Sequence, residues 1–144
     1  MKAVRYFLLV LALGCAYAAQ AQTSTSLAAT LRASKWQKRV LLLCAPTPDD
    51  ADLVRQRQLL GPVRGQLNSR DLLVREIIFS QLSTTDTRYL WEQLNVQPGR
   101  FAVLLIGKDG GVKRRETTPL PTAQLFSTID AMPMRQQEMR RAEQ

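Results

Sequence analysis

The fold of this chain is decided by one stretch, Arg39-Val40-Leu41-Leu42-Leu43-Cys44, which is followed at once by Ala45-Pro46-Thr47-Pro48-Asp49-Asp50. The apolar run after Arg39 has the length of a strand, and such a run suits a strand covered on both faces. The two prolines end it, and Asp49 or Asp50 can accept backbone N–H bonds at the start of a helix. The stretch therefore predicts a buried strand that leads directly into a helix.

Strand and helix patterns continue to alternate downstream. Gly61-Pro62 predicts a kink in the first helix or its division into two, and Asp86 is expected to cap the second. Asp109-Gly110 favours a hairpin turn, and Pro133 is expected to halt the last helix. The predicted strands cover 39–44, 72–79, 101–106 and 112–117, and the predicted helices cover 53–67, 86–94 and 122–132.

The resulting order is β-α-β-α-β-β-α, which is the order of a thioredoxin. We therefore predict an α/β fold, a thioredoxin-like three-layer sandwich with a mixed sheet. Right-handed crossovers would make the first three strands a parallel core, with the fourth strand antiparallel at a charged edge. Ahead of this domain (36–133) we expect an N-terminal arm (22–35) with one helical turn, anchored by Trp36, and behind it a charged tail (134–144).

The first 21 residues predict an export signal. Lys2 and Arg5 precede an apolar run over 6–13, and Ala19-Gln20-Ala21 has the form that signal peptidase reads. Cleavage after Ala21 would leave Gln22 as the mature N-terminus. The run is shorter than the roughly 20 apolar residues that span a bilayer, so the mature chain is expected to have no integral membrane segment.

Export places the protein in the periplasm or outside the cell. Cys15 offers an alternative, because Leu11-Ala12-Leu13-Gly14-Cys15 partly matches a lipoprotein signal. In that case the protein would be anchored through a lipid on Cys15.

The charge of the chain is basic, with a formal net value of +8. Without Lys2 and Arg5, 18 basic and 12 acidic residues remain, which gives +6. The basic residues cluster only at 113–115 and 140–141, and no aromatic residues alternate with them for base stacking. This pattern favours a solvated surface over nucleic acid binding, and it leaves an anionic polymer as an alternative partner.

The residue types present exclude several chemistries. The chain has no histidine, which excludes His-based triads and most zinc sites. The start of the first long helix, 46–51, has no cysteine where a thioredoxin has its Cys-x-x-Cys, and Asp49, Asp50 and Asp52 lack the spacing of a calcium loop. We therefore predict no catalytic residue, metal or cofactor.

Cys44 is the cysteine that would remain after cleavage, so an intramolecular disulfide is excluded. At the end of an apolar strand it is expected to be buried as a small hydrophobe. The alternative is a thiol oxidoreductase or a peroxidase-like enzyme that relies on Cys44 alone.

One binding site is predicted at the carboxyl edge of the sheet, where α/β folds place ligands. The predicted binding residues are Thr47, Asp49, Asp50 and Arg100. Arg100 could contact an anionic group or form an ion pair with Asp49 or Asp50.

Three motifs carry a resemblance to a known family: Arg39–Pro46, Phe101–Gly111 and Ile129–Arg135. On these the chain is similar to a family of small exported bacterial proteins of unassigned function with a thioredoxin- or peroxiredoxin-like fold. A related domain occurs in vertebrate sushi-repeat and secreted matrix proteins. The resemblance implies a fold and a compartment but no activity. We interpret the chain as an exported, noncatalytic binding module for an unknown protein or envelope component.

Overall fold

A single mixed sheet organises the protein, whose computed structural model describes residues 25–144. The predicted signal, its cleavage site at Ala21 and Gln22, and Cys15 lie outside the described residues. The strands are arranged in the order β2-β1-β3-β4. Their bounds are β1 (Arg39–Ala45), β2 (Leu72–Ile78), β3 (Ala102–Ile106) and β4 (Val112–Glu116).

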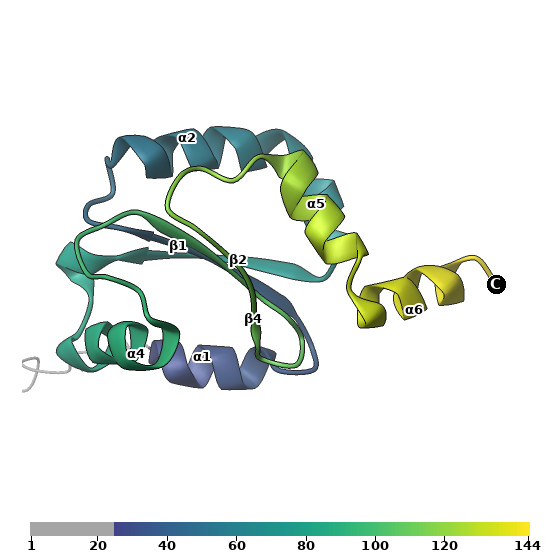
Figure 1. Cartoon of the computed structure of the whole chain (residues 1–144), viewed down its shortest axis with the longest axis horizontal. Coiled ribbons are helices and arrows are strands. Elements are labelled where there is room, and N and C mark those ends of the chain that lie inside the picture. Colours follow the sequence, from purple (N-terminus) through teal and green to yellow (C-terminus); the bar gives the residue numbers. More distant parts are fainter. Residues whose placement is uncertain (1–24) are drawn as a thin grey trace, which may run out of the picture.

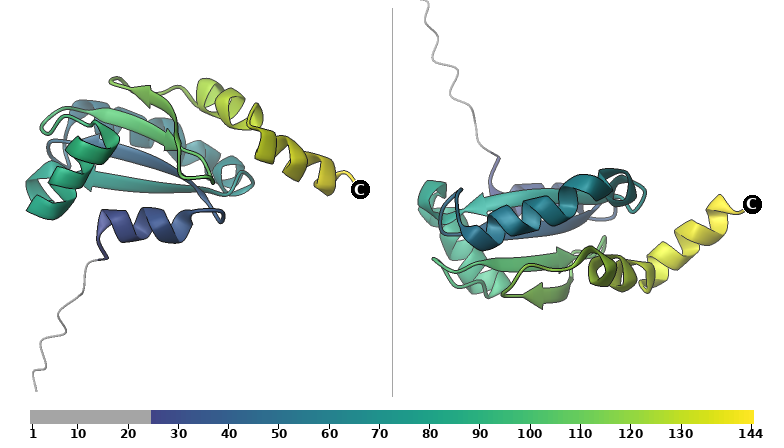
Figure 2. Two further views of the ribbon diagram at one scale, coloured as in Figure 1. Left: turned by 60° about the horizontal axis from the view of Figure 1, so that its bottom comes forward. Right: turned by 90° about the horizontal axis from the view of Figure 1, so that it is seen from above.

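Helices cover both faces of this sheet, as Figures 1 and 2 show. One face carries α1 (Leu27–Ser34) and α4 (Thr84–Leu94), and the other carries α2 (Ala51–Leu60), α3 (Arg64–Asn68) and α5 (Thr122–Asp130). Short 3₁₀ turns lie at η1 (Gly61–Val63) and η2 (Phe79–Gln81), and α6 (Pro133–Ala142) points away from the body. The predicted three-layer fold is confirmed. None of the helices within residues 25–144 is long and apolar enough to cross a bilayer.

The apolar run of β1 is continuous because the strand serves two cores. Alternate side chains point to opposite faces, so Leu41 and Leu43 pack under α2 and α5, while Leu42 and Cys44 pack against α1 and α4. All seven residues of β1 are buried.

The direction of β3 corrects the predicted parallel core. β1 and β2 are parallel, but β3 runs antiparallel to β1, with Cys44 opposite Ala102. After α4 the chain lies at the end of the sheet where β1 finishes, and the backbone carbonyl of Asn95 accepts a hydrogen bond there from Arg115 of β4 at 3.1 Å. The chain therefore enters β3 from that end and can only run backwards beside β1.

Two predicted helix features are confirmed and one is wrong. Asp50 caps α2, and its Oδ1 accepts from the N–H groups of Asp52 and Leu53, both at 3.1 Å. The 3₁₀ turn at Gly61–Val63 separates α2 from α3, as the Gly-Pro pair predicted. Ser83, and not Asp86, caps α4.

The arm is attached to the body by contacts other than the predicted one. The carboxylate of Asp86 accepts a hydrogen bond from the backbone N–H of Leu27 at 3.0 Å, which joins α1 to α4. Leu27 is buried, whereas Trp36 is 60% exposed and has a positive φ of 66°. The prediction that Trp36 anchors the arm is wrong because the chain turns there and directs the side chain to solvent.

The last two helices are tied to the start of the sheet by ion pairs. Pro133 does not end α5, which already stops at Asp130. Pro133 is instead the first residue of α6, and α6 lies in the segment predicted as a tail. Glu138 of α6 accepts from the two terminal guanidinium nitrogens of Arg39 at 3.1 and 3.2 Å and lies 2.7 Å from Nζ of Lys108. Lys108 also pairs with Asp71 at 2.9 Å. We call Arg39, Asp71, Lys108 and Glu138 the β1-start network.

Candidate functional site

A hollow of about 590 Å³ lies at the end of the sheet where β1 finishes. We call it the β1-end hollow. Its wall is formed by the loop that follows β1, by the connection between α4 and β3, and by β4. The residues that line it are Pro46, Asp50, Asp52, Asn95, Val96, Gln97, Gly99, Arg100, Phe101, Ala102, Arg115 and Thr117.

Two of the four predicted binding residues face this hollow. Asp50 and Arg100 both line it, whereas Thr47 and Asp49 belong to the same loop but not to the wall. A hydrogen bond from Thr47 lowers the pKa of the exposed Asp49 carboxyl. Among residues 25–144 no ion pair joins Arg100 to Asp49 or Asp50.

The cations of the hollow lack carboxylate partners in the described part of the chain. Arg100 is exposed and makes neither an ion pair nor a side-chain hydrogen bond there, and Arg115 donates only to the carbonyl of Asn95. Asp50 uses one carboxylate oxygen to cap α2, which leaves it oriented along the helix start. The hollow therefore carries two guanidinium groups that can donate to an anion.

Arg115 is a site residue that the sequence did not reveal. It was visible only as part of the basic run 113–115 on a predicted edge strand. Alternation along β4 turns Arg114 toward α5, where it contacts Thr128 at 3.1 Å, and turns Arg115 toward the end of α4. The approach of β4 to Asn95 depends on the antiparallel pairing of β3, which was not predicted.

Cys44 lies beneath this end of the sheet and is closed to solvent. Its side chain packs with Leu42 and Leu90 in the core between the sheet, α1 and α4. Burial raises the pKa of the thiol to about 12, although the positive charge of Arg115 acts in the opposite direction. Because the thiolate is the reactive form, this raised pKa favours the protonated thiol near neutral pH.

A metal site and a reactive thiol site each require a particular set of side chains. Within residues 25–144, no group of three or more carboxylate or cysteine side chains is placed to hold a metal ion. The start of α2, where a reactive thiol would be activated by the helix, is occupied by Asp50. The hollow offers guanidinium donors from Arg100 and Arg115 together with the carboxylates of Asp50 and Asp52.

Comparison with known proteins identifies the family of the chain. Residues 30–138 match the family described as Domain of unknown function (DUF4174), and the chain belongs to that family. It is 25% identical over 129 residues to coiled-coil domain-containing protein 80 of Danio rerio, a match that covers 73% of this chain and 15% of that protein. The chain thus spans only a small part of that relative.

Two solved structures are similar in fold. The reduced 2-Cys peroxiredoxin of Plasmodium vivax superposes with a TM-score of 0.56 at 14% identity, over 74% of this chain and 84% of that one. The mitochondrial 2-Cys peroxiredoxin of Plasmodium falciparum gives 0.53 at 12% identity, over 69% and 77%. The predicted family and thioredoxin-like fold are confirmed; at these identities the likeness concerns the fold alone.

The third motif of the sequence analysis, Ile129–Arg135, has a structural explanation. Asp130 accepts from Arg70 at 3.0 and 2.7 Å and from Arg135 at 3.3 Å. Arg135 also donates to the carbonyl of Ser69 at 2.9 Å, and the Arg70 guanidinium lies 4.3 Å from the ring centre of Phe126. The motif therefore fixes α5 and α6 against the turn before β2 and lies away from the β1-end hollow.

Proposed function

We propose that this protein is an exported, noncatalytic binding module that presents the β1-end hollow to an anionic group on another protein or on an envelope component. One observation carries the proposal: Cys44 is fully buried, and its pKa is raised to about 12. A protein that depended on this thiol would need it accessible and at least partly ionised.

The charges around the hollow support a binding role. Ligands of α/β proteins commonly lie outside the carboxyl ends of the strands, and both β1 and β2 end on this side of the sheet. Arg100 would be the main contact and Arg115 a second donor, and Asp50 lines the same hollow. Thr47 and Asp49 lie in the same loop as Asp50, outside the wall, and are proposed as further contacts. A guanidinium presents a fork of N–H donors that matches carboxylate or phosphate oxygens.

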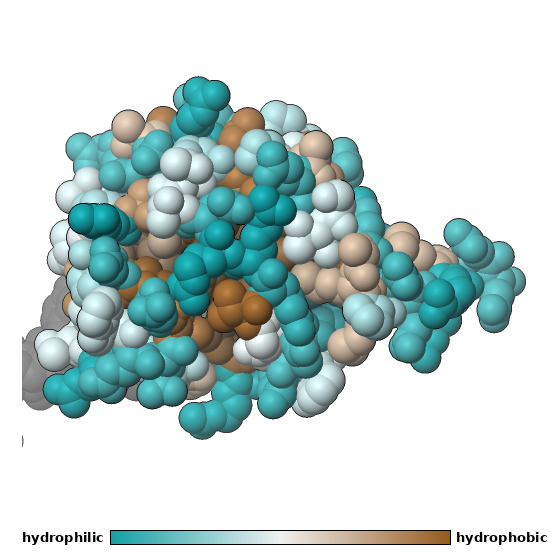
Figure 3. Space-filling view, in the orientation of Figure 1, coloured by the Kyte–Doolittle hydropathy of each residue, from teal (hydrophilic) through white to brown (hydrophobic). Residues whose placement is uncertain are grey.

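The face of the molecule seen in Figure 3 is consistent with a water-exposed module. Figure 3 shows one face on which hydrophilic side chains dominate and apolar ones occupy small separate areas. A large apolar patch would instead indicate an obligate interface. Export by a signal at 1–21, with an arm at 22–35, a domain at 36–133 and a charged tail at 134–144, is part of the proposal.

Two competing functions make different predictions. A peroxidase-like enzyme using Cys44 is suggested by the names of the structural neighbours, and it requires a reactive thiol. A basic protein that binds an anionic polymer through scattered charge would lose affinity steeply with salt and would depend on no single arginine.

The test is a titration of the mature chain with inorganic phosphate, followed through the backbone amide resonances of residues 95–97 and 99–101. We expect Arg100→Gln to weaken binding several-fold and Cys44→Ala to bind as the unmodified chain does. Arg88→Gln is the matched control, because Arg88 is an exposed arginine of α4 that does not line the hollow. Equal losses in Arg100→Gln and Arg88→Gln, or loss of binding in Cys44→Ala, would overturn the proposal.

A further inference from the structure

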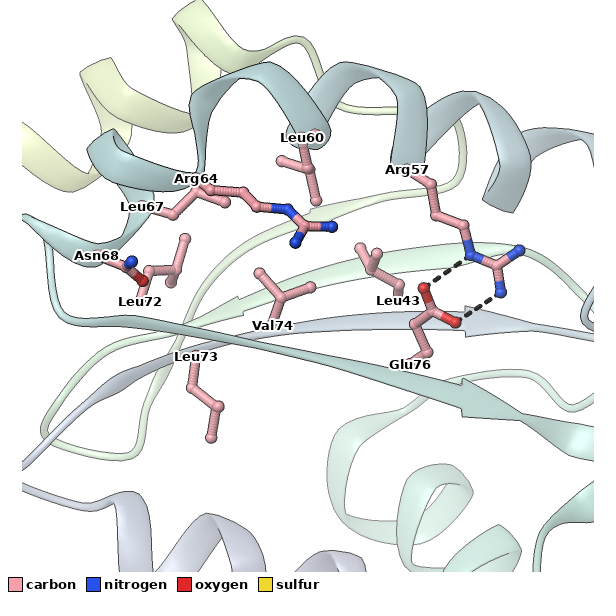
Figure 4. A pocket seen from close by; sticks show the side chains of 11 residues that line it. Leu43, Arg57, Leu60, Arg64, Leu67, Asn68, Leu72, Leu73, Val74 and Glu76 are labelled. Carbon is pink, nitrogen blue, oxygen red and sulfur yellow. Dashed lines mark hydrogen bonds and ion pairs between the residues drawn. The ribbon is translucent and has the colours of Figure 1, made fainter.

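A second cavity, separate from the β1-end hollow, lies between the helices α2 and α3 and the outer strand β2 (Figure 4). Its volume is about 460 Å³, within the range of roughly 300–1,000 Å³ typical of small-molecule sites. We call it the β2 groove. Because β2 is at the edge of the sheet, the groove opens to solvent along that edge.

The floor of the groove is apolar. Leu60 and Leu67 contribute from the helices, and Leu43, Leu72 and Val74 contribute from the sheet. Figure 4 shows Leu60 pointing down toward the sheet and Val74 pointing up toward the helices, while Leu73 points to the opposite face. The space between the two layers is therefore bounded above and below by hydrocarbon.

One ion pair at the mouth is already complete. Arg57 donates from Nε and Nη2 to the two carboxylate oxygens of Glu76 at 2.8 and 2.6 Å, and from Nη1 to the carbonyl of Pro48 at 2.8 Å. The hydrogen bond from Arg57, with its positive charge, lowers the pKa of the Glu76 carboxyl despite partial burial. The two charges cancel, and both residues have used their strongest donors and acceptors.

Arg64 is different. Within residues 25–144 it makes no ion pair and no side-chain hydrogen bond, and Figure 4 shows its guanidinium reaching from α3 into the space between Leu60 and Val74. Asn68, one helical turn further along, also lines the groove, and Figure 4 shows it at the end away from the Arg64 guanidinium. The groove thus combines an apolar floor, one uncompensated positive charge and one amide.

We propose that the β2 groove binds a small amphiphile with a single negative charge, a medium-chain carboxylate. The carboxylate would pair with Arg64, and the hydrocarbon chain would lie against Leu60 and Val74. Charge complementarity selects this occupant: the Arg57–Glu76 pair is neutral, so the site carries one net positive charge next to hydrocarbon. A positively charged ligand would be repelled by Arg64, and an uncharged ligand would leave Arg64 without an ionic partner.

The test is a titration of the mature chain with decanoate below its micelle concentration, followed by two-dimensional NMR. We expect resonance shifts confined to α2, α3 and β2, and we expect Arg64→Gln to weaken decanoate binding several-fold. Arg55→Gln is the matched control, since Arg55 is an exposed arginine of α2 that does not line the groove. Decanol should bind more weakly than decanoate and should not distinguish Arg64→Gln from the unmodified chain.

Other results would overturn the proposal. They are the absence of shifts in the groove, an equal effect of Arg55→Gln, or decyltrimethylammonium binding as tightly as decanoate. A second titration uses a pentapeptide of alternating Val and Glu in place of decanoate. If it shifts the β2 amides while decanoate does not, the open strand edge accepts a peptide strand instead. Arg64 is exposed, so its substitution leaves the fold intact, and thermal unfolding of each variant verifies this.

Discussion

The two ends of β1 carry similar charged residues but use them in opposite ways. At its start, the nearly fully buried Arg39 is bonded to Glu138 of α6, and Lys108 joins Glu138 to Asp71. At its other end, Arg100 and Arg115 border a hollow without a carboxylate partner in the described chain. Charges that satisfy one another fix the structure, whereas charges left open to solvent can be satisfied by a ligand.

The largest effect should come from opening the β1-start network. Replacing Glu138 with Ala leaves the Arg39 guanidinium buried with only the carbonyl of Arg70, at 2.9 Å, as a partner. Its Nε already lacks a partner. We expect a loss of about 3 kcal/mol in the free energy of unfolding, because removing one member of a buried pair strands the other charge. Urea unfolding measures this.

Two further variants separate the lost ion pair from a general effect on α6. Glu143→Ala, at the exposed end of the same helix, should change the free energy of unfolding by no more than about 0.5 kcal/mol. Replacing Arg39 and Glu138 together with Leu should recover much of the stability, since no unpaired charge then remains buried. A double variant as unstable as Glu138→Ala would contradict this explanation.

The pH dependence of stability should come from the same end of the sheet. The pKa of Asp71 is lowered, chiefly by the hydrogen bond from Lys108. Partial burial acts to raise the pKa of Glu138, but hydrogen bonds from Lys108 and Arg39 outweigh it and the net pKa is lowered.

A carboxyl whose pKa is lowered in the folded state stabilises the fold at pH values above its ordinary pKa of about 4. This contribution is lost as the pH falls through the folded-state pKa. We therefore expect the free energy of unfolding to be nearly level from neutral pH to about 5 and to fall below about 4. Glu138→Gln should be less stable at neutral pH and should show a shallower fall in acid. A parallel pair of pH curves would show that Glu138 does not contribute to the acid sensitivity.

Most of the fold followed from local pattern. The apolar run of β1, the Gly61-Pro62 break and the cap at Asp50 each act through residues close in sequence, so the sequence shows them directly. The direction of β3 and the exposure of Trp36 were not predictable in this way. Both depend on where the chain lies after α4 or α1, which is set by contacts between distant segments.

The candidate site was predictable only in part, for the same reason. Asp50 and Arg100 were identified because they flank predicted strands, and the structure places both around one hollow. Arg115 reaches that hollow across two antiparallel pairings, and the role of Glu138 requires α6 to return to Arg39, ninety-nine positions away in the chain. Long-range juxtapositions of this kind leave no periodic signal.

The smallest stability effect is expected at the β1-end hollow. Arg100→Gln should change the free energy of unfolding by no more than about 0.5 kcal/mol, because the side chain is exposed and pairs with no described residue. Arg100→Gln should nevertheless lose phosphate affinity. A substitution at the end of β1 would then change binding without changing stability, whereas Glu138→Ala at its start changes stability. A destabilisation comparable to that of Glu138→Ala would remove the distinction between them.

The state of Cys44 provides the most direct test of a thiol-independent function. The mature, folded chain would be treated with hydrogen peroxide and then alkylated with iodoacetamide, in buffer and in denaturant, with the intact mass recorded each time. We predict no rapid peroxide consumption beyond slow oxidation of exposed methionine such as Met134, and no modification of Cys44 in the folded chain, followed by complete alkylation of Cys44 once the chain is unfolded. Rapid oxidation of Cys44 in the folded chain, with matching consumption of peroxide, would contradict the noncatalytic assignment and identify a thiol enzyme.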